Sequence, residues 1–260
     1  MTWPREEWRL DTRRLGRRVL VYDCVDSTNN LAAALAADPT NEGAVILAGA
    51  QTAGRGQHGR SWLAPPNASV LLSVLCFPPE TLRRPAVLTA WAAVSVCGVI
   101  QRLLGRPARI KWPNDVLLHG KKVCGILIEQ QRGTVVGIGL NVRQTAEHFT
   151  AAGLPDATSL SLHAPPSIPL ETAVVARELI HQLDAEYDLL CAGEQSALEA
   201  CWKWHLGLLG KPVVAECHDG IYRGRLLDLG FTGVELEQPG GLPLVLQPER
   251  VQHLRADGVP

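Results

Sequence analysis

The sequence has almost no net charge and no closely spaced pair of cysteines. Its 260 residues carry a formal net charge of -1, so no global field attracts nucleic acid or an acidic membrane surface. The seven cysteines form no Cys-x-x-Cys pair, which argues against a disulfide framework and against a structural zinc site. These absences favour reduced, mostly buried cysteines and a cytoplasmic location.

The sequence also lacks targeting signals and long uninterrupted apolar runs. Its first seven residues contain no apolar segment after basic residues, so no signal peptide is expected. The longest apolar stretch, residues 86–104, is interrupted by polar residues and by Arg102. This pattern predicts a buried helix and not a membrane span. We find no internal repeat and no low-complexity tract.

What is present is an ordinary globular composition, with 46% hydrophobic and 20% charged residues. Periodicity and turn residues predict alternating strands and helices along most of the chain. Helices are expected at residues 5–17, 31–37, 85–104, 170–190 and 198–206. Strands are expected at residues 19–22, 44–50 and 68–77, with two hairpin segments at 116–131 and 134–141.

The pattern of predicted secondary structure changes after Gly210-Lys211-Pro212. Four short strands are expected there, separated by turn residues, at 213–217, 222–229, 233–237 and 242–246. Regular strand spacing of this kind is typical of a small all-β, barrel-like module. We therefore predict two domains, residues 1–208 and residues 209–260.

A glycine-rich segment lies inside the long loop at residues 51–67. Gly54-Arg55-Gly56-Gln57-His58-Gly59 matches Gly-x-Gly-x-x-Gly, but Pro65-Pro66 stops the helix that a dinucleotide site requires. Two interpretations remain, a flexible surface loop and an anion-binding loop. Glycines allow backbone N–H groups to approach an anion, and Arg55 and Arg60 supply positive charge, so we favour anion binding.

Three further segments have both a structural and a functional interpretation. Lys111-Trp112-Pro113-Asn114-Asp115 is either a surface turn or a rigid unit that aims Lys111. Gly125, and Gly137 with Gly139, mark either bulges or a strand face that something approaches closely. Ser27-Thr28-Asn29 either caps a helix or binds a polar ligand.

Taken together, the order and spacing of these segments resemble the biotin–protein ligases. The resemblance covers residues 19–142 strongly and the C-terminal module more loosely. It implies an α+β fold in which a mixed sheet is flanked by helices on one side, as in class II aminoacyl-tRNA synthetases, followed by a small C-terminal SH3-like β-barrel. It also implies an enzyme that forms biotinyl-5′-AMP from biotin and ATP and transfers biotin to a lysine of a biotin carboxyl carrier protein.

The resemblance assigns roles to individual residues. Catalytic charge is expected from Lys111, Arg55 and Arg60. Contacts to biotin are expected from Ser27, Thr28, Asn29, Gln51, Gly54, Arg55, Gly56, Gln57, His58, Gly59, Lys111, Gly125, Gly137 and Gly139. Contacts to ATP are expected from Arg55, Arg60, Trp62, Lys111, Asn114 and Asn141. Many relatives have arginine at the position of Gln57, which leaves two expectations open: the adenylate is retained more weakly here, or Arg55 and Arg60 suffice to retain it.

Magnesium is expected to arrive with ATP and to have no fixed protein site. Homodimers are common in the family and remain open here. The nearest alternative is a lipoate or octanoate ligase or transferase of the same fold. Two other classes are a transcriptional repressor, disfavoured because no DNA-binding helices precede residue 19, and a binding module without catalysis, disfavoured by the presence of Lys111.

Overall fold

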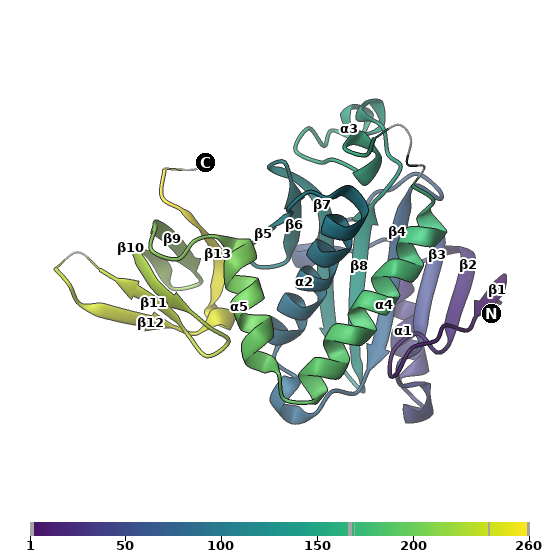
Figure 1. The fold of residues 1–260 in the computed structure, drawn as a ribbon, viewed down its shortest axis with the longest axis horizontal. Helices are drawn as coiled ribbons and strands as arrows, with labels where there is room; N and C mark the ends of the chain where they lie inside the picture. The colour runs from purple at the N-terminus through teal and green to yellow at the C-terminus, as the bar shows by residue number, and fades with distance from the viewer. Residues whose placement is uncertain (1–2, 166–167, 169, 239, 259–260) are drawn as a thin grey trace.

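A computed structural model describes residues 3–165, 168, 170–238 and 240–258, without the side chain of residue 58. Within these residues the larger part is an eight-stranded mixed sheet in the order β1-β2-β3-β4-β8-β7-β6-β5 (Figure 1). Its strands are β1 (Glu6–Trp8), β2 (Val19–Val25), β3 (Val45–Gln51), β4 (Ser69–Cys76), β5 (Arg109–Lys111), β6 (Asp115–Leu118), β7 (Lys121–Gln130) and β8 (Thr134–Asn141). Only β2 and β3 pair in parallel.

Alternation along the central strands separates the two faces of this sheet. On β4, Val70, Leu72 and Val74 belong to the main apolar core, which α2 (Pro85–Leu104) and α4 (Thr172–Cys191) cover. Leu75 of the same strand faces the smaller core beneath α1 (Thr28–Leu35). The face that carries α1 is only partly covered, and the candidate site lies there.

The helix predicted from the longest apolar stretch is confirmed. Helix α2 begins at Pro85 and ends before Gly105, whose φ of 64° suits a residue without a side chain. It is long and apolar enough to cross a membrane, but 72% of that window is buried inside the protein. Helix α2 packs between the sheet, α4 and α5 (Gln195–Leu206), so it is a core helix.

Two sequence-based predictions are wrong. The helices do not lie on one side only, because α1 forms the crossover between the parallel strands β2 and β3 and packs on the opposite face. The expected helix at residues 5–17 is absent among the described residues. Strand β1 pairs with β2 instead, and the buried Asp184 carboxylate accepts hydrogen bonds from the backbone N–H groups of residues 13–15.

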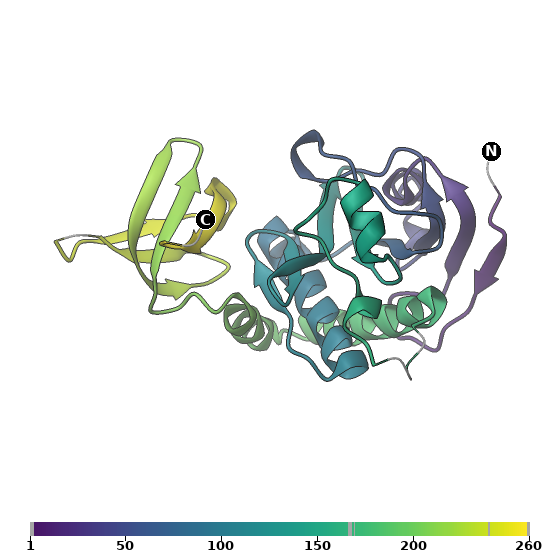
Figure 2. The ribbon, with the colours of Figure 1, turned by 90° about the horizontal axis from the view of Figure 1, so that it is seen from above.

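The C-terminal strands form a separate five-stranded antiparallel sheet in the order β12-β11-β10-β9-β13 (Figure 2). They are β9 (Pro212–Cys217), β10 (Gly220–Leu229), β11 (Val234–Glu237), β12 (Pro243–Leu246) and β13 (Val251–Ala256). The predicted small β module is confirmed, although β13 was not predicted. The boundary at residue 208 stays a prediction. Short helix α3 (Ala146–Ala151), also not predicted, follows β8.

Candidate functional site

A cavity of about 470 Å³ opens on the α1 face of the large sheet. Its walls come from the start of α1, the end of β3, the glycine-rich loop, the β5–β6 turn, and strands β7 and β8. Most of the residues that sequence analysis selected line it: Ser27, Thr28, Asn29, Gln51, Arg55, Gly56, Gln57, Arg60, Trp62, Lys111, Asn114, Gly125, Gly137, Gly139 and Asn141.

One end of the cavity is polar and is formed by neutral side chains beside the Arg55–Glu129 ion pair. Thr28 begins α1, and both its backbone N–H and its hydroxyl oxygen lie within 3.1 Å of the Gln51 carbonyl oxygen Oε1. Ser73 of β4 lies beneath, 2.7 Å from the Thr28 hydroxyl and 2.6 Å from Asn29 Oδ1. Thr28, Asn29 and Ser73 are all buried, so this cluster is fixed in place by its own hydrogen bonds.

The predicted helix cap has a different chemical origin from the one expected. Ser27 occupies the N-cap position of α1 but makes no capping hydrogen bond with its side chain. The Asp26 carboxylate accepts from the Ser27 backbone N–H and from the Asn30 amide instead. The hydrogen bond from the Asn30 amide contributes most to lowering the pKa of Asp26, and the hydrogen bond from the Ser27 backbone lowers it further. Ser27 and Thr28 are thereby left facing the cavity.

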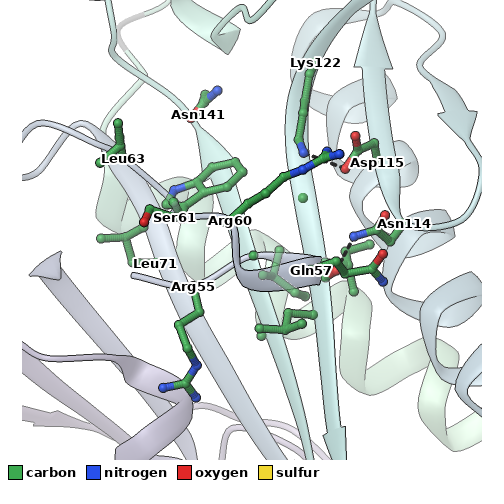
Figure 3. Close-up of a pocket in the computed structure, with 18 of the residues that line it drawn as sticks. Arg55, Gln57, Arg60, Ser61, Leu63, Leu71, Asn114, Asp115, Lys122 and Asn141 are labelled. Atoms are coloured by element: carbon green, nitrogen blue, oxygen red, sulfur yellow. Dashed lines mark hydrogen bonds and ion pairs between the residues drawn. The ribbon is translucent and has the colours of Figure 1, made fainter. Parts of the chain in front are cut away.

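The glycine-rich loop is an ordered hairpin. Gly56 N–H donates to the Arg60 carbonyl, Trp62 N–H donates to the Gly54 carbonyl, and Arg55 pairs with Ser61. A side chain at Gly54 would lie 2.6 Å from the Trp62 carbonyl oxygen, so this close crossing requires glycine. The hairpin directs Arg55 and Arg60 to different ends of the cavity, as Figure 3 shows.

The two loop arginines therefore have different surroundings. Arg55 donates to both carboxylate oxygens of Glu129, at 2.8 and 3.0 Å, and also to Asn30. Arg60 extends toward Lys122 and Asp115 (Figure 3). Arg55 lines the cavity, but its guanidinium points away from the cationic end.

The glycines of β7 and β8 do receive a close neighbour. A Cβ atom at Gly139 would lie 2.5 Å from the indole ring of Trp62, and one at Gly125 would lie 2.9 Å from it. At Gly137 the neighbour would be Asn29 Oδ1, at 2.3 Å. The bare strand face therefore seats the Trp62 ring and the Asn29 amide, in agreement with the expected close approach.

A cationic end faces this glycine surface. The Lys122 ammonium lies 2.7 Å from Asp115 Oδ1 and 5.7 Å from the centre of the Trp62 ring. Lys111 is exposed and lines the same end, where β5 turns into β6. Lys122 is a site residue that sequence analysis missed. It lies between the Lys111-containing motif and Gly125 in the sequence, so a search for every lysine close to Gly125 would have included it.

Asn114 and Asn141, which were predicted to contact ATP, also make hydrogen bonds that stabilise the fold around the cavity. Asn114 Nδ2 donates to the Ile126 carbonyl at 2.7 Å, and the Ile126 N–H donates back to the Asn114 carbonyl. Asn141 Nδ2 donates to the Thr158 carbonyl, while its Oδ1 accepts from Gln144. Both amides line the cavity and hold its walls together.

Not every predicted residue faces the cavity. Gly54 and Gly59 do not line it, although both shape the hairpin that does. The side chain of His58 lies outside the described part of the chain. Ser73 and Glu129 were not predicted as site residues, yet both bond to side chains that line the cavity.

The C-terminal module reaches the cavity as well. His253 of β13 lines it. The buried Trp112 ring donates its Nε1–H to the Val251 carbonyl at 2.7 Å, and Arg84 pairs with Glu249 just before β13. These contacts fasten β13 to the rim beside Lys111.

The site contains few groups that prefer a metal ion. Across the described residues, no group of three or more His, Cys, Asp or Glu side chains is arranged to hold one. Among the described residues that line the cavity, the carboxylate is that of Asp115, and Asn114 lies next to it. One carboxylate and one amide suit an ion that keeps most of its water or phosphate ligands, as Mg²⁺ does.

Comparison with known proteins identifies the family to which the chain belongs. Residues 21–143 match the model of the biotin/lipoate A/B protein ligase family. The chain is 38% identical over 238 residues to the biotin--[acetyl-CoA-carboxylase] ligase of Mycobacterium tuberculosis, covering 88% of this chain and 78% of that protein. It is 32% identical to the bifunctional ligase/repressor BirA of Bacillus subtilis, covering 87% and 71%. The chain belongs to the biotin/lipoate A/B protein ligase family.

The fold is shared with solved members of this family. The biotin protein ligase from Aquifex aeolicus in complex with biotin and ATP superimposes with a TM-score of 0.75 at 24% identity, covering 92% of this chain and 99% of that one. The overlap extends beyond the region that the family model matches. The mixed sheet and the C-terminal β module thus form the arrangement that members of the biotin/lipoate A/B protein ligase family adopt.

Proposed function

We propose that this chain is an ATP-dependent biotin–protein ligase that forms biotinyl-5′-AMP and transfers biotin to a lysine of a biotin carboxyl carrier protein. One observation carries the proposal: a single cavity joins a neutral hydrogen-bonding end, at Thr28 and Gln51, to a cationic end, at Lys122 and Arg60. A ligand with a polar ring at one end and a carboxylate at the other fits this arrangement.

The first step brings two anions together. A carboxylate oxygen of biotin attacks the α-phosphorus of ATP, the bond from that phosphorus to the bridging oxygen breaks, and pyrophosphate leaves with the electron pair. The cations near the reacting groups reduce the repulsion between the two anions and stabilise the charge that builds up in the transition state. Lys122, Arg60 and Lys111 line the end where this happens.

We assign the larger share of this task to Lys122. Lys122 is oriented by Asp115 and rests near the Trp62 ring, so its position is fixed before the substrates bind. Lys111, which the family resemblance selects, is exposed on the short strand β5. A fixed cation stabilises a transition state more than a freely moving one, because no reorganisation is needed.

Magnesium fits this site as a companion of ATP. When bound, Mg²⁺ would neutralise the phosphates, and Asp115 and Asn114, which line the cavity, are the residues that would hold it. The protein itself orients the acid at Thr28 and Gln51 and excludes water by closing the hairpin and Trp62 over the glycine face.

In the second step the amine of the carrier lysine attacks the acyl carbon of the mixed anhydride. The carbon–oxygen bond to AMP breaks, and the amine loses a proton. Asp115 is the candidate acceptor for this proton because it lines the cavity beside Lys122. We place the carrier beside β13, where the exposed residue His253 lines the cavity.

The test is exchange of labelled pyrophosphate into ATP in the presence of one acid at a time. Biotin should support exchange, and lipoate and octanoate should not. Exchange with lipoate or octanoate alone would assign the chain to the other branch of the family. Exchange with none of the three acids would leave a binding module without adenylation.

Several expectations accompany this proposal. The relatives named biotin ligases support biotin over lipoate. The seven cysteines are free thiols, which supports a reducing, cytoplasmic location. The absence of nucleic-acid binding stays a prediction, and homodimer formation stays open. Relatives named ligase/repressor make nucleic-acid binding worth measuring by gel shift.

A further inference from the structure

We propose that His253 of the C-terminal module binds the pyrophosphate end of ATP, so that this module completes the part of the site that forms the adenylate. The inference rests on the proposed function and assigns a task to the C-terminal module. It begins with the exposed side chain of His253, which lines the cavity although β13 belongs to the smaller sheet. Within the part of the chain that the structure describes, this side chain makes no hydrogen bond or ion pair.

A bulge in β13 directs His253 toward the cavity. In a regular strand, Val251 and His253 would point to the same face, because successive side chains alternate. Val251 is buried in the main core, whereas His253 is exposed. The pairing of β13 with β9 shifts between these two residues, since Val251 lies opposite Cys217 and His253 lies opposite Glu216. The additional residue, Gln252, therefore redirects the side chain that follows it.

The register of the large sheet gives the order of the groups across the cavity. Gly139 of β8 pairs with Gly125 of β7, which pairs with Asp115 of β6. Asp115 pairs in turn with Lys111 of the edge strand β5. Adjacent strands are about 4.8 Å apart, so the backbone of Lys111 lies about 10 Å from that of Gly125. Strand β13 follows beyond this edge, because the Trp112 ring donates a hydrogen bond to it (Figure 1).

The two sides of this row differ in chemistry. On the β8 side, Phe149 and Leu154 line the cavity together with the Asn141 amide. Apolar walls with one amide suit a heteroaromatic base. On the β5 side, the cavity is lined by Lys111 and His253, whose N–H groups suit the oxygens of a phosphate chain.

ATP therefore has one orientation that matches both sides. Its α-phosphate lies near Lys122, between the two sides, because the biotin carboxylate attacks it there. With the base on the β8 side, the β- and γ-phosphates extend toward β5 and β13. His253 can donate a ring N–H to a phosphate oxygen in either protonation state. The carrier is placed beside β13 as well, so pyrophosphate has to leave before the carrier docks.

The experiment separates the two half-reactions. Biotin-dependent exchange of labelled pyrophosphate into ATP gives the KM values of pyrophosphate, ATP and biotin. Transfer from supplied biotinyl-5′-AMP to a saturating carrier domain needs no pyrophosphate. His253→Ala should raise the KM of pyrophosphate and of ATP about tenfold, the usual effect of losing one hydrogen bond to a charged group. The KM of biotin and the rate of transfer should stay unchanged.

A rescue variant and a matched control accompany this substitution. His253→Lys should recover most of the affinity for pyrophosphate, because an ammonium group also donates to phosphate oxygens. The control is His181→Ala, since His181 is exposed too but lies on α4 and outside the cavity lining. It should leave all four values unchanged. Thermal unfolding of each variant establishes that it is folded.

The outcomes separate this inference from the proposed function. A wild-type chain without biotin-dependent exchange overturns both. When the wild-type chain does exchange, an unchanged KM of pyrophosphate in folded His253→Ala overturns the inference alone, as does an equal rise in the KM of biotin. The inference also fails if transfer from supplied biotinyl-5′-AMP falls as much as exchange does. It fails again if His253→Lys binds pyrophosphate no better than His253→Ala.

Discussion

At the scale of single residues, the orientation of Lys122 depends on one irregularity in β7. Gly125 faces the cavity, and simple alternation would place Val123 on that face and Lys122 on the opposite one. The pairing of β6 with β7 shifts between Val116 and Leu117, so one extra residue of β7 opposes the partner strand. This bulge turns Val123 into the core and Lys122 toward the cavity.

The two lysines of the cationic end can be distinguished by substitution. Lys122→Gln should lower the turnover of biotin-dependent pyrophosphate exchange about 10²- to 10³-fold, the cost of removing one preorganised donor. Lys111→Gln should lower it by less, because Lys111 is exposed, whereas Lys122 is oriented by Asp115 and the Trp62 ring. Steady-state exchange rates at saturating biotin and ATP give both values. A larger loss from Lys111→Gln would restore the assignment that the sequence motif suggests.

At the scale of elements, the segment before β2 is held to α4 by one carboxylate. Asp184 accepts three backbone hydrogen bonds, from Arg13, Arg14 and Leu15, at 2.7 to 2.8 Å. Asp184 is 5% exposed. Such a group gives this non-helical segment the partners that its backbone N–H groups need.

Substitution of this carboxylate should destabilise the fold. Asp184→Asn should lower the free energy of unfolding by about 2–3 kcal/mol, because hydrogen bonds to a buried charge are lost and an amide NH₂ faces backbone donors. The neighbouring Asp188 pairs with the side chains of Arg13 and Arg14 at the surface, so Asp188→Asn should cost less than about 1 kcal/mol. Urea unfolding measures both, and equal losses would contradict the account.

The elements that the sequence predicted have signals within their own residues, whereas the missed elements depend on contacts with other elements. Strand β8 and helix α2 were predicted with their observed ends, because turn residues, Pro85 and Gly105 mark those ends within the sequence. Strands β1 and β13 were missed because each is stabilised by pairing at the edge of its sheet, β1 with β2 and β13 with β9, and this pairing leaves no signal in the local sequence. The same holds for Ser73 and Glu129, whose roles arise only when β4, β7 and α1 meet.

At the scale of the whole molecule, the two sheets meet at Trp112. This buried ring packs near Trp202, at 5.4 Å between ring centres, and donates to the Val251 carbonyl of β13. The Lys111-Trp112-Pro113-Asn114-Asp115 motif was expected to orient Lys111. Through Trp112 it also attaches the C-terminal module. Attachment places His253 on the cavity wall.

Weakening this junction should affect both stability and nucleotide binding. Trp112→Phe keeps a ring but leaves the Val251 carbonyl without this donor, at a cost of about 1–3 kcal/mol. The KM for ATP should rise more than the KM for biotin, because the polar end at Thr28 lies on other elements. Trp204→Phe is the control, because the Trp204 ring is 58% exposed. It should change neither the stability nor the KM for ATP. Equal changes in both KM values would contradict this role of the junction.

The central claim is that this chain attaches biotin to a carrier lysine at the expense of ATP. Its most direct test is the intact mass of a purified biotin carboxyl carrier domain after incubation with the chain, biotin and MgATP. We predict a gain of one biotinyl group on one lysine, dependent on ATP and abolished when that lysine is replaced. A carrier whose mass stays unchanged, or one modified only when lipoate or octanoate replaces biotin, would contradict the account.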